Sequence, residues 1–439
     1  MLLLCAALVL GAQPAQKIFP YEYSQEDLPN GLRLITVPTD YPNIVSVYIV
    51  VQTGSRNEIE PGLTGFAHLF EHLMFRGTPK ISPQQYNETL NRIGASSNAS
   101  TSDDLTLYHT TFSKEDLDTV MSMEADRFQN LKFAEPEFKT ESLAVLGEYN
   151  KNSSSPFSKL QEALADTAFD RHTYKHTTMG FLKDIQDMPN QYEYSLKFFD
   201  RYYRPEYTTI VVVGDVQAKA VRAMVDKYWG QWKRGSYHSD IPVEPAQDGP
   251  RTRQVDWPSP TLPLLTIAYK QPAYDDATRD TAALDALSNL AFSQTSDLYQ
   301  RLVVQEQKAD SLGAQSSASV DPSLFTISAR VKKAEDLGYV RDQILATIKT
   351  FQDQPVDTAR LDRVRNRLRY QLALSMDNSD TIAQIVSSFV SLRRTPETMN
   401  RLFAQYGQLT PEDIQQAAKQ YLTEKTQTIV TLTGPGGAK

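Results

Sequence analysis

The chain repeats itself at one fixed offset, and this constrains its fold more than any other feature of the sequence. Three pairs of segments are separated by 219 residues: Gly94–Ser100 and Gly313–Ser319, Thr209–Val211 and Thr428–Val430, and Tyr202 and Tyr421. Several matches at a single offset indicate two copies of one domain, and 439 residues exceed the size of one ordinary hydrophobic core. Because strand-like and helix-like segments are mixed within each copy, we predict an α+β fold with two homologous domains, each a mostly antiparallel sheet with helices packed on one face.

The predicted boundaries follow from this repeat and from local composition. We expect a first domain over residues 17–239, a linker over residues 240–258, where prolines and polar residues gather, and a second domain over residues 259–439. Residues 1–16 begin with an apolar run that is too short to span a bilayer and is typical of a secretory signal, although a positive N-terminal region is missing. A buried N-terminal strand is the alternative. A signal would make the protein periplasmic or secreted.

Composition excludes several kinds of function. A net charge of −8 without any run of Lys or Arg argues against nucleic-acid binding, and no segment after residue 16 has the length of a membrane span. The single cysteine, Cys5, lies inside the candidate signal. A mature chain would contain no thiol, so disulfides and thiol catalysis are excluded, and any metal must be held by His, Asp or Glu.

Such ligands are concentrated in the segment Gly65–Arg76, where His68, Glu71 and His72 have the spacing His-x-x-Glu-His. Residues four apart share one face of a helix, so both imidazoles can reach one point with a carboxylate nearby. Two imidazoles and a carboxylate suit a catalytic zinc site with an open position for water, and the spacing is the inverted-zincin pattern. The alternative is a structural helix with hydrogen-bonded histidines. The second copy lacks the motif, so we expect the metal in the first domain.

Two further carboxylates lie on a predicted helix that runs from Pro136 to about Tyr149. Glu141 and Glu148 are seven residues apart, which is nearly two helical turns, so both face the same way. The residues alone do not select a metal ligand among the four candidates in this region, which are Glu135, Glu137, Glu141 and Glu148.

The motif, the segment Glu141–Glu148 and the duplication together resemble the pitrilysin/insulinase family of zinc peptidases. The chain is most similar to the zinc-bearing subunit in the shorter branch of that family, which includes mitochondrial processing peptidase, and the resemblance covers nearly everything after residue 20. It implies that His68, His72 and Glu148 bind one Zn²⁺ and that Glu71 activates the attacking water. It also implies that Glu141 orients a ligand through a hydrogen bond.

Two other segments also resemble the family. The segment from Asn98 to Thr101 is similar to its Asn-Ala-x-Thr segment, an exposed strand edge that pairs with the backbone of an extended peptide substrate. The resemblance implies that Asn98, Ala99 and Ser100 contact the substrate, and an ordinary turn is the alternative. His172–His176 resembles a common His-x-Tyr segment, which we interpret as structural because its histidines are not spaced to join the zinc.

The second domain departs from the family pattern. Members that are active as single chains, and certain partner subunits, carry an Arg and a Tyr seven residues apart that reach the reacting carbonyl. Val303 and Asp310 occupy these positions here. A valine cannot donate a hydrogen bond to a developing oxyanion, and an aspartate would repel it. We therefore expect a homologous partner subunit to supply the pair in a heterodimer, with an active homodimer as the alternative.

The sequence thus predicts a zinc-dependent metalloendopeptidase that hydrolyses peptides or unfolded protein segments. A function of a different class is a non-catalytic assembly or chaperone-like subunit of the same fold. Such a subunit would be expected to have lost at least one of the implied ligands, whereas His68, His72 and Glu148 are all present.

Overall fold

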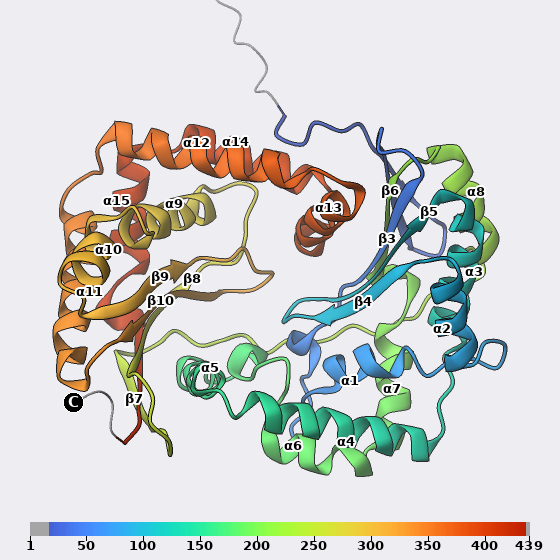
Figure 1. The fold of residues 1–439 in the computed structure, drawn as a ribbon, viewed down its shortest axis with the longest axis horizontal. Coiled ribbons are helices and arrows are strands. Elements are labelled where there is room, and N and C mark those ends of the chain that lie inside the picture. The colour runs from blue at the N-terminus through green and yellow to red at the C-terminus, as the bar shows by residue number, and fades with distance from the viewer. Residues whose placement is uncertain (1–16, 436–439) are drawn as a thin grey trace, which may run out of the picture.

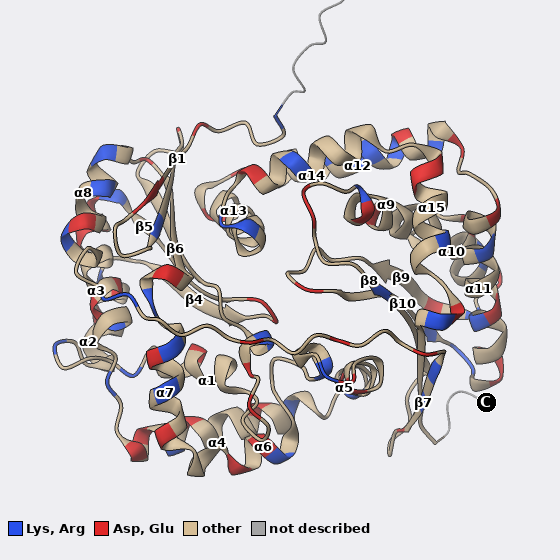
Figure 2. Ribbon diagram, turned by 180° about the vertical axis from the view of Figure 1, so that it is seen from behind, with Lys and Arg blue, Asp and Glu red and all other residues tan. Residues whose placement is uncertain are grey.

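The computed structural model describes residues 17–435, which form two halves that lie side by side (Figure 1). The candidate signal over residues 1–16, with Cys5, lies outside the described residues. Within residues 17–435, no helix is long and apolar enough to cross a membrane. Basic and acidic residues are interspersed over the helices of both halves (Figure 2).

Each half is built on one sheet. The first sheet has six strands in the order β1-β2-β6-β3-β5-β4, and the second has five in the order β7-β11-β8-β10-β9. The strands of the first sheet are β1 (Ser24–Asp27), β2 (Arg33–Pro38), β3 (Ile44–Val51), β4 (Ser96–Thr101), β5 (Thr106–Ser113) and β6 (Thr208–Gly214). Those of the second are β7 (Arg251–Asp256), β8 (Leu264–Gln271), β9 (Ala309–Gln315), β10 (Ser323–Val331) and β11 (Gln427–Thr433).

The two sheets have equivalent topology, which confirms the predicted duplication. Neighbouring strands are antiparallel except for one parallel pair in each sheet, β2–β6 in the first and β7–β11 in the second. The repeated segment Thr209–Val211 lies in β6, and its match Thr428–Val430 lies at the same position in β11. The predicted mostly antiparallel sheets are therefore confirmed.

Helices cover both sheets. In the first half they are α1 (Phe66–Leu73), α2 (Pro83–Arg92), α3 (Leu117–Asn130), α4 (Glu135–Asn152), α5 (Pro156–Ala168), α6 (Leu182–Asp187), α7 (Tyr192–Tyr202) and α8 (Ala218–Trp229). In the second half they are α9 (Asp280–Phe292), α10 (Asp297–Tyr299), α11 (Leu337–Asp353), α12 (Thr358–Ser375), α13 (Ser379–Arg393), α14 (Glu397–Gln408) and α15 (Pro411–Tyr421). Tyr202 and Tyr421 end the equivalent helices α7 and α15.

The halves exchange one helix each. Besides the helices of its own half on one face, the first sheet has α13 of the second half on the other face (Figure 1). Ile382 and Val386 of α13 pack there against β3 and β6. In return, Leu160 and Leu164 of α5 pack on the second sheet. This exchange explains why every residue of β6 is buried and why residues 210–213 are all apolar, because a strand buried on both faces has no solvent side.

The segment between the halves is only partly a linker. Residues 240–250 contain no helix or strand, but Arg251–Asp256, at the end of the interval that we expected to be a linker, forms β7 at the edge of the second sheet. Its mostly polar sequence looks like an exposed loop, and its strand conformation depends on backbone pairing with β11, which local composition does not reveal.

Candidate active site

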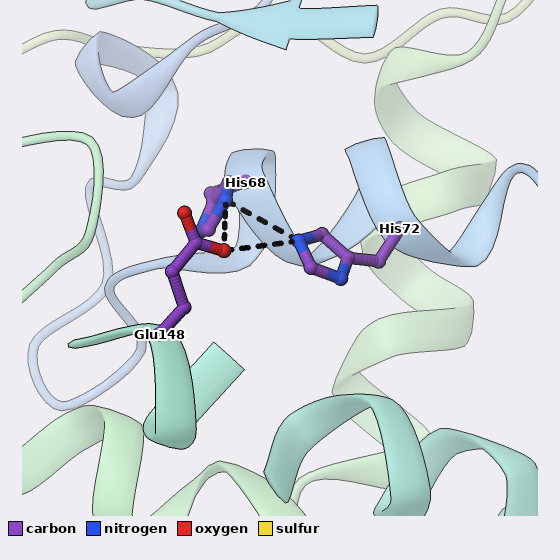
Figure 3. A group of neighbouring side chains, drawn as sticks. All are labelled: His68, His72 and Glu148. Atoms are coloured by element: carbon purple, nitrogen blue, oxygen red, sulfur yellow. Dashed lines mark hydrogen bonds and ion pairs between the residues drawn. The ribbon is translucent and has the colours of Figure 1, made fainter. Parts of the chain in front are cut away.

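The His-x-x-Glu-His motif forms the short helix α1, which is anchored by its apolar side chains. Phe66, Leu69, Phe70 and Leu73 are buried in the core between the first sheet and its helices. Because these residues fix the rotation of the helix, His68 and His72 are directed away from the core and toward α4 (Figure 3).

The start of α1 is held by Glu58, a fully buried residue. Its carboxylate accepts hydrogen bonds of 2.7 Å from the backbone N–H groups of both Gly65 and Ala67, in the place of a capping side chain. Burial raises the pKa of Glu58 to about 8, although the hydrogen bonds from the backbone donors act in the opposite direction. Gly65 has φ +90° and approaches Gly180 so closely that a side chain at Gly180 would lie 2.7 Å from the Gly65 nitrogen.

His68, His72 and Glu148 meet at one point (Figure 3). The Nε2 atoms of His68 and His72 are 3.4 Å apart, and Oε2 of Glu148, on α4, is 3.5 Å from each. Burial, followed by the neighbouring His72, lowers the pKa of His68 to about 4, although the Glu148 carboxylate opposes this. The imidazole of His68 is therefore neutral at pH 7 and can offer a lone pair.

These three atoms fit a zinc ion. A point equidistant from the three lies about 2.0 Å from each of them, which is the length of Zn–N and Zn–O bonds. The side chain of His68 is 9% exposed, whereas that of Glu148 is 40% exposed. One side of the group is thus buried and the other is open, which leaves room for a water molecule and for a substrate.

A second carboxylate, that of Glu141, contacts the imidazole of His72 at the nitrogen that faces away from the three clustered atoms. Glu141, one double turn before Glu148 on α4, has its Oε2 3.3 Å from Nδ1 of His72. Its other oxygen forms an ion pair with Arg76, three residues after α1 ends. A carboxylate at the far nitrogen of an imidazole fixes the tautomer and the orientation of the ring. The other two candidate carboxylates have different partners, since Glu135 pairs with Lys139 and Glu137 accepts from the backbone at the start of α4.

Glu71 lies on α1 between the two histidines, and its environment raises its pKa. Burial is the main cause, opposed by a hydrogen bond of 2.7 Å from Oγ1 of Thr101 to Oε2 of Glu71. Thr101 is the last residue of strand β4. A carboxylate with a raised pKa beside a group of metal-binding type has the properties of a general base.

Strand β4 is the edge of the first sheet, because β5 is its one partner among residues 17–435. Since Thr101 reaches Glu71, alternation along the strand places Ala99, which is buried, on the same face. Asn98 and Ser100 are exposed on the opposite face, and Oδ1 of Asn98 accepts from the backbone N–H of Ala99. The structure therefore places β4 beside α1. Of the three side chains expected to bind substrate, only that of Ala99 lies on the face of β4 that contacts α1.

The segment with the missing Arg and Tyr lies in the second half. Val303 belongs to a π-helical turn after α10 and packs against the core of that half, and Asp310, at the start of β9, pairs with Arg330.

The His-x-Tyr segment lies apart from the His68–His72–Glu148 group. Nε2 of His172, in this segment, is 2.9 Å from Oδ2 of Asp321.

Sequence reasoning missed three residues of this site: Glu58, Arg76 and Thr101. Each acts by holding another side chain or a helix end, and each comes from a different segment. Thr101 lies in the segment that resembles the family, but its sequence gave no sign of a contact with Glu71. Only the packing of β4 against α1 brings the two together.

The fold and the site define a duplicated α+β protein with one His-His-Glu group of metal-binding geometry in its first half. Comparison with known proteins gives the family. Residues 33–181 match the sequence profile of the insulinase family, peptidase family M16, and residues 191–368 match that of the peptidase M16 inactive domain. The chain belongs to peptidase family M16.

Relatives and solved structures agree with this assignment. The zinc protease PqqE of Helicobacter pylori is 28% identical over 430 residues, which cover 96% of this chain and 95% of that protein. A probable mitochondrial-processing peptidase subunit beta of Schizosaccharomyces pombe is 24% identical, with 91% and 88% covered. The crystal structure of a protease from Helicobacter pylori superposes with a TM-score of 0.87 at 28% identity, covering 94% of this chain and 99% of that one. The periplasmic protease PqqL of Escherichia coli has the same fold, with a TM-score of 0.74 at 19% identity, and 48% of its length is covered.

Proposed function

We propose that the chain is a zinc-dependent endopeptidase that hydrolyses peptides or unfolded protein segments. The observation that carries the proposal is the near-equilateral arrangement of the His68, His72 and Glu148 ligand atoms, with the Glu71 carboxylate on the same helix. Names of relatives, such as zinc protease, support it. Bound to these three residues, Zn²⁺ would polarise the scissile carbonyl and lower the pKa of a water molecule in the open position.

In this proposal, Glu71 is the general base. Its carboxylate takes a proton from the attacking water and later passes that proton to the leaving amine. The hydrogen bond from Thr101 keeps the carboxylate oriented. Glu141 holds the far nitrogen of His72, so that the ring presents Nε2 to the metal, and Arg76 holds Glu141 in turn.

The substrate would bind as an extended strand along β4. The free edge of this strand offers backbone N–H and C=O groups, which bind a peptide without reading its side chains. The polar sequence of β4 keeps this open edge soluble until a substrate covers it. The position of β4 beside α1 would bring the scissile bond close to Glu71.

We further propose that a homologous partner subunit completes the site. The side chains of Val303 and Asp310 supply no hydrogen-bond donor for an oxyanion, and both pack or pair within the second half. One relative is named as a subunit of a peptidase. This chain also covers 93% of the structure of the first half of PqqL, but only 48% of the whole of PqqL. PqqL therefore has a second part of similar size within the same chain.

The decisive test is the variant Glu71→Gln. It should retain one zinc per chain after reconstitution and lose cleavage of an internally quenched peptide that is blocked at both ends. Glu135→Gln, a surface carboxylate on α4, is the matched control and should keep both properties. Unchanged cleavage by Glu71→Gln would refute the mechanism. A wild-type chain that binds less than one zinc and cleaves nothing would favour the non-catalytic subunit.

The partner is tested by assaying the purified chain with and without a co-expressed homologue that carries the Arg and Tyr. We expect the pair to have the higher turnover. Equal turnover of the chain alone would refute the need for a partner and would favour an active homodimer.

A further inference from the structure

The tip of the β9–β10 hairpin reaches from the second half to the loops of the first half that precede α1 and follow β4. This tip spans residues 316–322, between the two strands. Oδ2 of Asp321 lies 2.5 Å from Nε of Arg56 and 2.9 Å from Nε2 of His172, both in the first half. The backbone N–H of Val320 donates to Oδ2 of Asp104, at 3.1 Å.

The partners of Asp321 are themselves fixed. The backbone N–H of Tyr174 donates to Nδ1 of His172, so Nε2 carries the proton and donates to Asp321. The hydroxyl of Tyr174 donates to Oδ1 of Asp104, at 2.6 Å. Burial alone would raise the pKa of Asp321, but the hydrogen bonds from His172 and Arg56 outweigh it and lower that pKa to about 2.

One connection leads from Asp321 to helix α1. The backbone N–H of Arg56 donates to the carbonyl of Asp103, and its carbonyl accepts from Oγ1 of Thr173 at 2.6 Å, so both ends of the residue are held. Two residues later, Glu58 holds the start of α1. A shift of Arg56 would therefore move the cap of the helix that carries His68, Glu71 and His72.

A second connection leads to the substrate edge. Asp103 and Asp104 lie two and three residues after the end of β4, and Oγ of Ser55 donates to Oδ1 of Asp103 at 2.9 Å. Because Thr101 is only two residues before Asp103, the same contacts also fix the threonine that holds Glu71. The segment that follows β4 is thus bonded to Arg56, the residue that Asp321 holds from the half that provides none of the three clustered ligands.

We propose that Asp321 is a positioning residue for the peptidase site, through which the second half fixes the start of α1 and the end of β4. The proposal rests on the proposed peptidase function. It assigns to the second half a role in catalysis within its own chain, separate from the Arg and Tyr expected from a partner.

The test compares Asp321→Asn with Asp276→Asn. Asp276 is a matched control, because it also accepts from an arginine and a ring-bearing residue (Arg401 and Tyr274), but all three lie in the second half. The Asp276 side chain is 27% exposed and that of Asp321 is 25% exposed. We expect Asp321→Asn to lower kcat by at least about tenfold, with KM and zinc content close to wild type. Asp276→Asn should leave kcat within about twofold of wild type.

Amide hydrogen exchange tests the same positioning without relying on activity. Asp321→Asn should increase exchange in residues 56–75 and 96–105, and Asp276→Asn should not. Arg56→Gln should have the same effect, and adding it to Asp321→Asn should produce little further change, because the two variants break one contact. If Asp321→Asn matches Asp276→Asn in both kcat and exchange, the proposal is wrong. If the wild-type chain cleaves no peptide, the proposed function fails, but the hydrogen-exchange comparison still tests whether Asp321 fixes α1 and β4. The two proposals can therefore fail separately.

Discussion

Oγ1 of Thr101 donates a 2.7 Å hydrogen bond to Oε2 of Glu71, and this bond joins the free edge of the first sheet to the histidine helix. Thr101 is the last residue of β4, so the strand proposed to bind substrate ends on the proposed base. The placement of substrate and the orientation of the base are therefore parts of one structure.

Replacing Thr101 by Val should lower kcat by about 10- to 100-fold, because a hydrogen bond to a charged group contributes about 1.5–3 kcal/mol. Thr101→Ser keeps the hydroxyl and should restore most of the activity. Steady-state kinetics on a quenched peptide, together with zinc analysis, would check this. A Thr101→Val variant with wild-type kcat would show that the bond does not orient the base.

Replacing Glu141 by Gln should weaken zinc binding by about 10- to 100-fold, because this carboxylate holds the far nitrogen of His72. Competition with a chromogenic chelator measures the affinity. Glu135→Gln, on the exposed side of the same helix, provides the control and should bind zinc as tightly as wild type. Equal affinities for the two variants would contradict the role of Glu141.

Removing zinc should lower the unfolding temperature of the protein. A ligand that binds only the folded state at 1,000 times its Kd adds about 4 kcal/mol to the free energy of unfolding. Calorimetry of wild type with and without zinc should show the shift, and His72→Ala should show almost none. A shift of the same size in His72→Ala would place the stabilising zinc elsewhere.

Stability should depend on pH through Lys270, which lies outside the candidate site. Burial lowers the pKa of Lys270 to about 8, although the ion pair with Glu244 opposes this. The unfolded chain then binds more protons than the folded chain between pH 8 and about 10.4, so this group makes stability rise with pH across that window. Urea unfolding gives the free energy of unfolding of wild type and of Lys270→Met. The value for wild type should rise relative to that of Lys270→Met from pH 8 to 10. A difference that stays constant would contradict the lowered pKa.

Much of the fold and part of the candidate site could be predicted from the sequence. Matches such as Thr209–Val211 with Thr428–Val430 indicated the duplication, because equivalent strands keep similar buried residues. The seven-residue spacing placed Glu141 and Glu148 on one face, and the structure brings both beside the histidines. These inferences succeed because helical and strand periodicity are local properties.

What could not be predicted depends on contacts between distant segments. Glu58 caps α1 from a loop, and Asp321 contacts Arg56, two residues before Glu58, from the other half of the chain, although neither lies in a distinctive motif. The apolar sequence of β6 implies cover on both faces, but it does not identify α13 as the cover. Such pairings are decided by tertiary packing, to which a single sequence gives no direct access.

The exchange of α5 and α13 has a consequence for synthesis on the ribosome. One face of the first sheet is covered by Ile382 and Val386, so it stays exposed until α13 has left the ribosome, long after the strands themselves have been made. The first half therefore cannot complete its core before most of the second half exists. A nascent chain in this interval displays a broad apolar face, which is the kind of surface that chaperones bind and that aggregates when they are scarce.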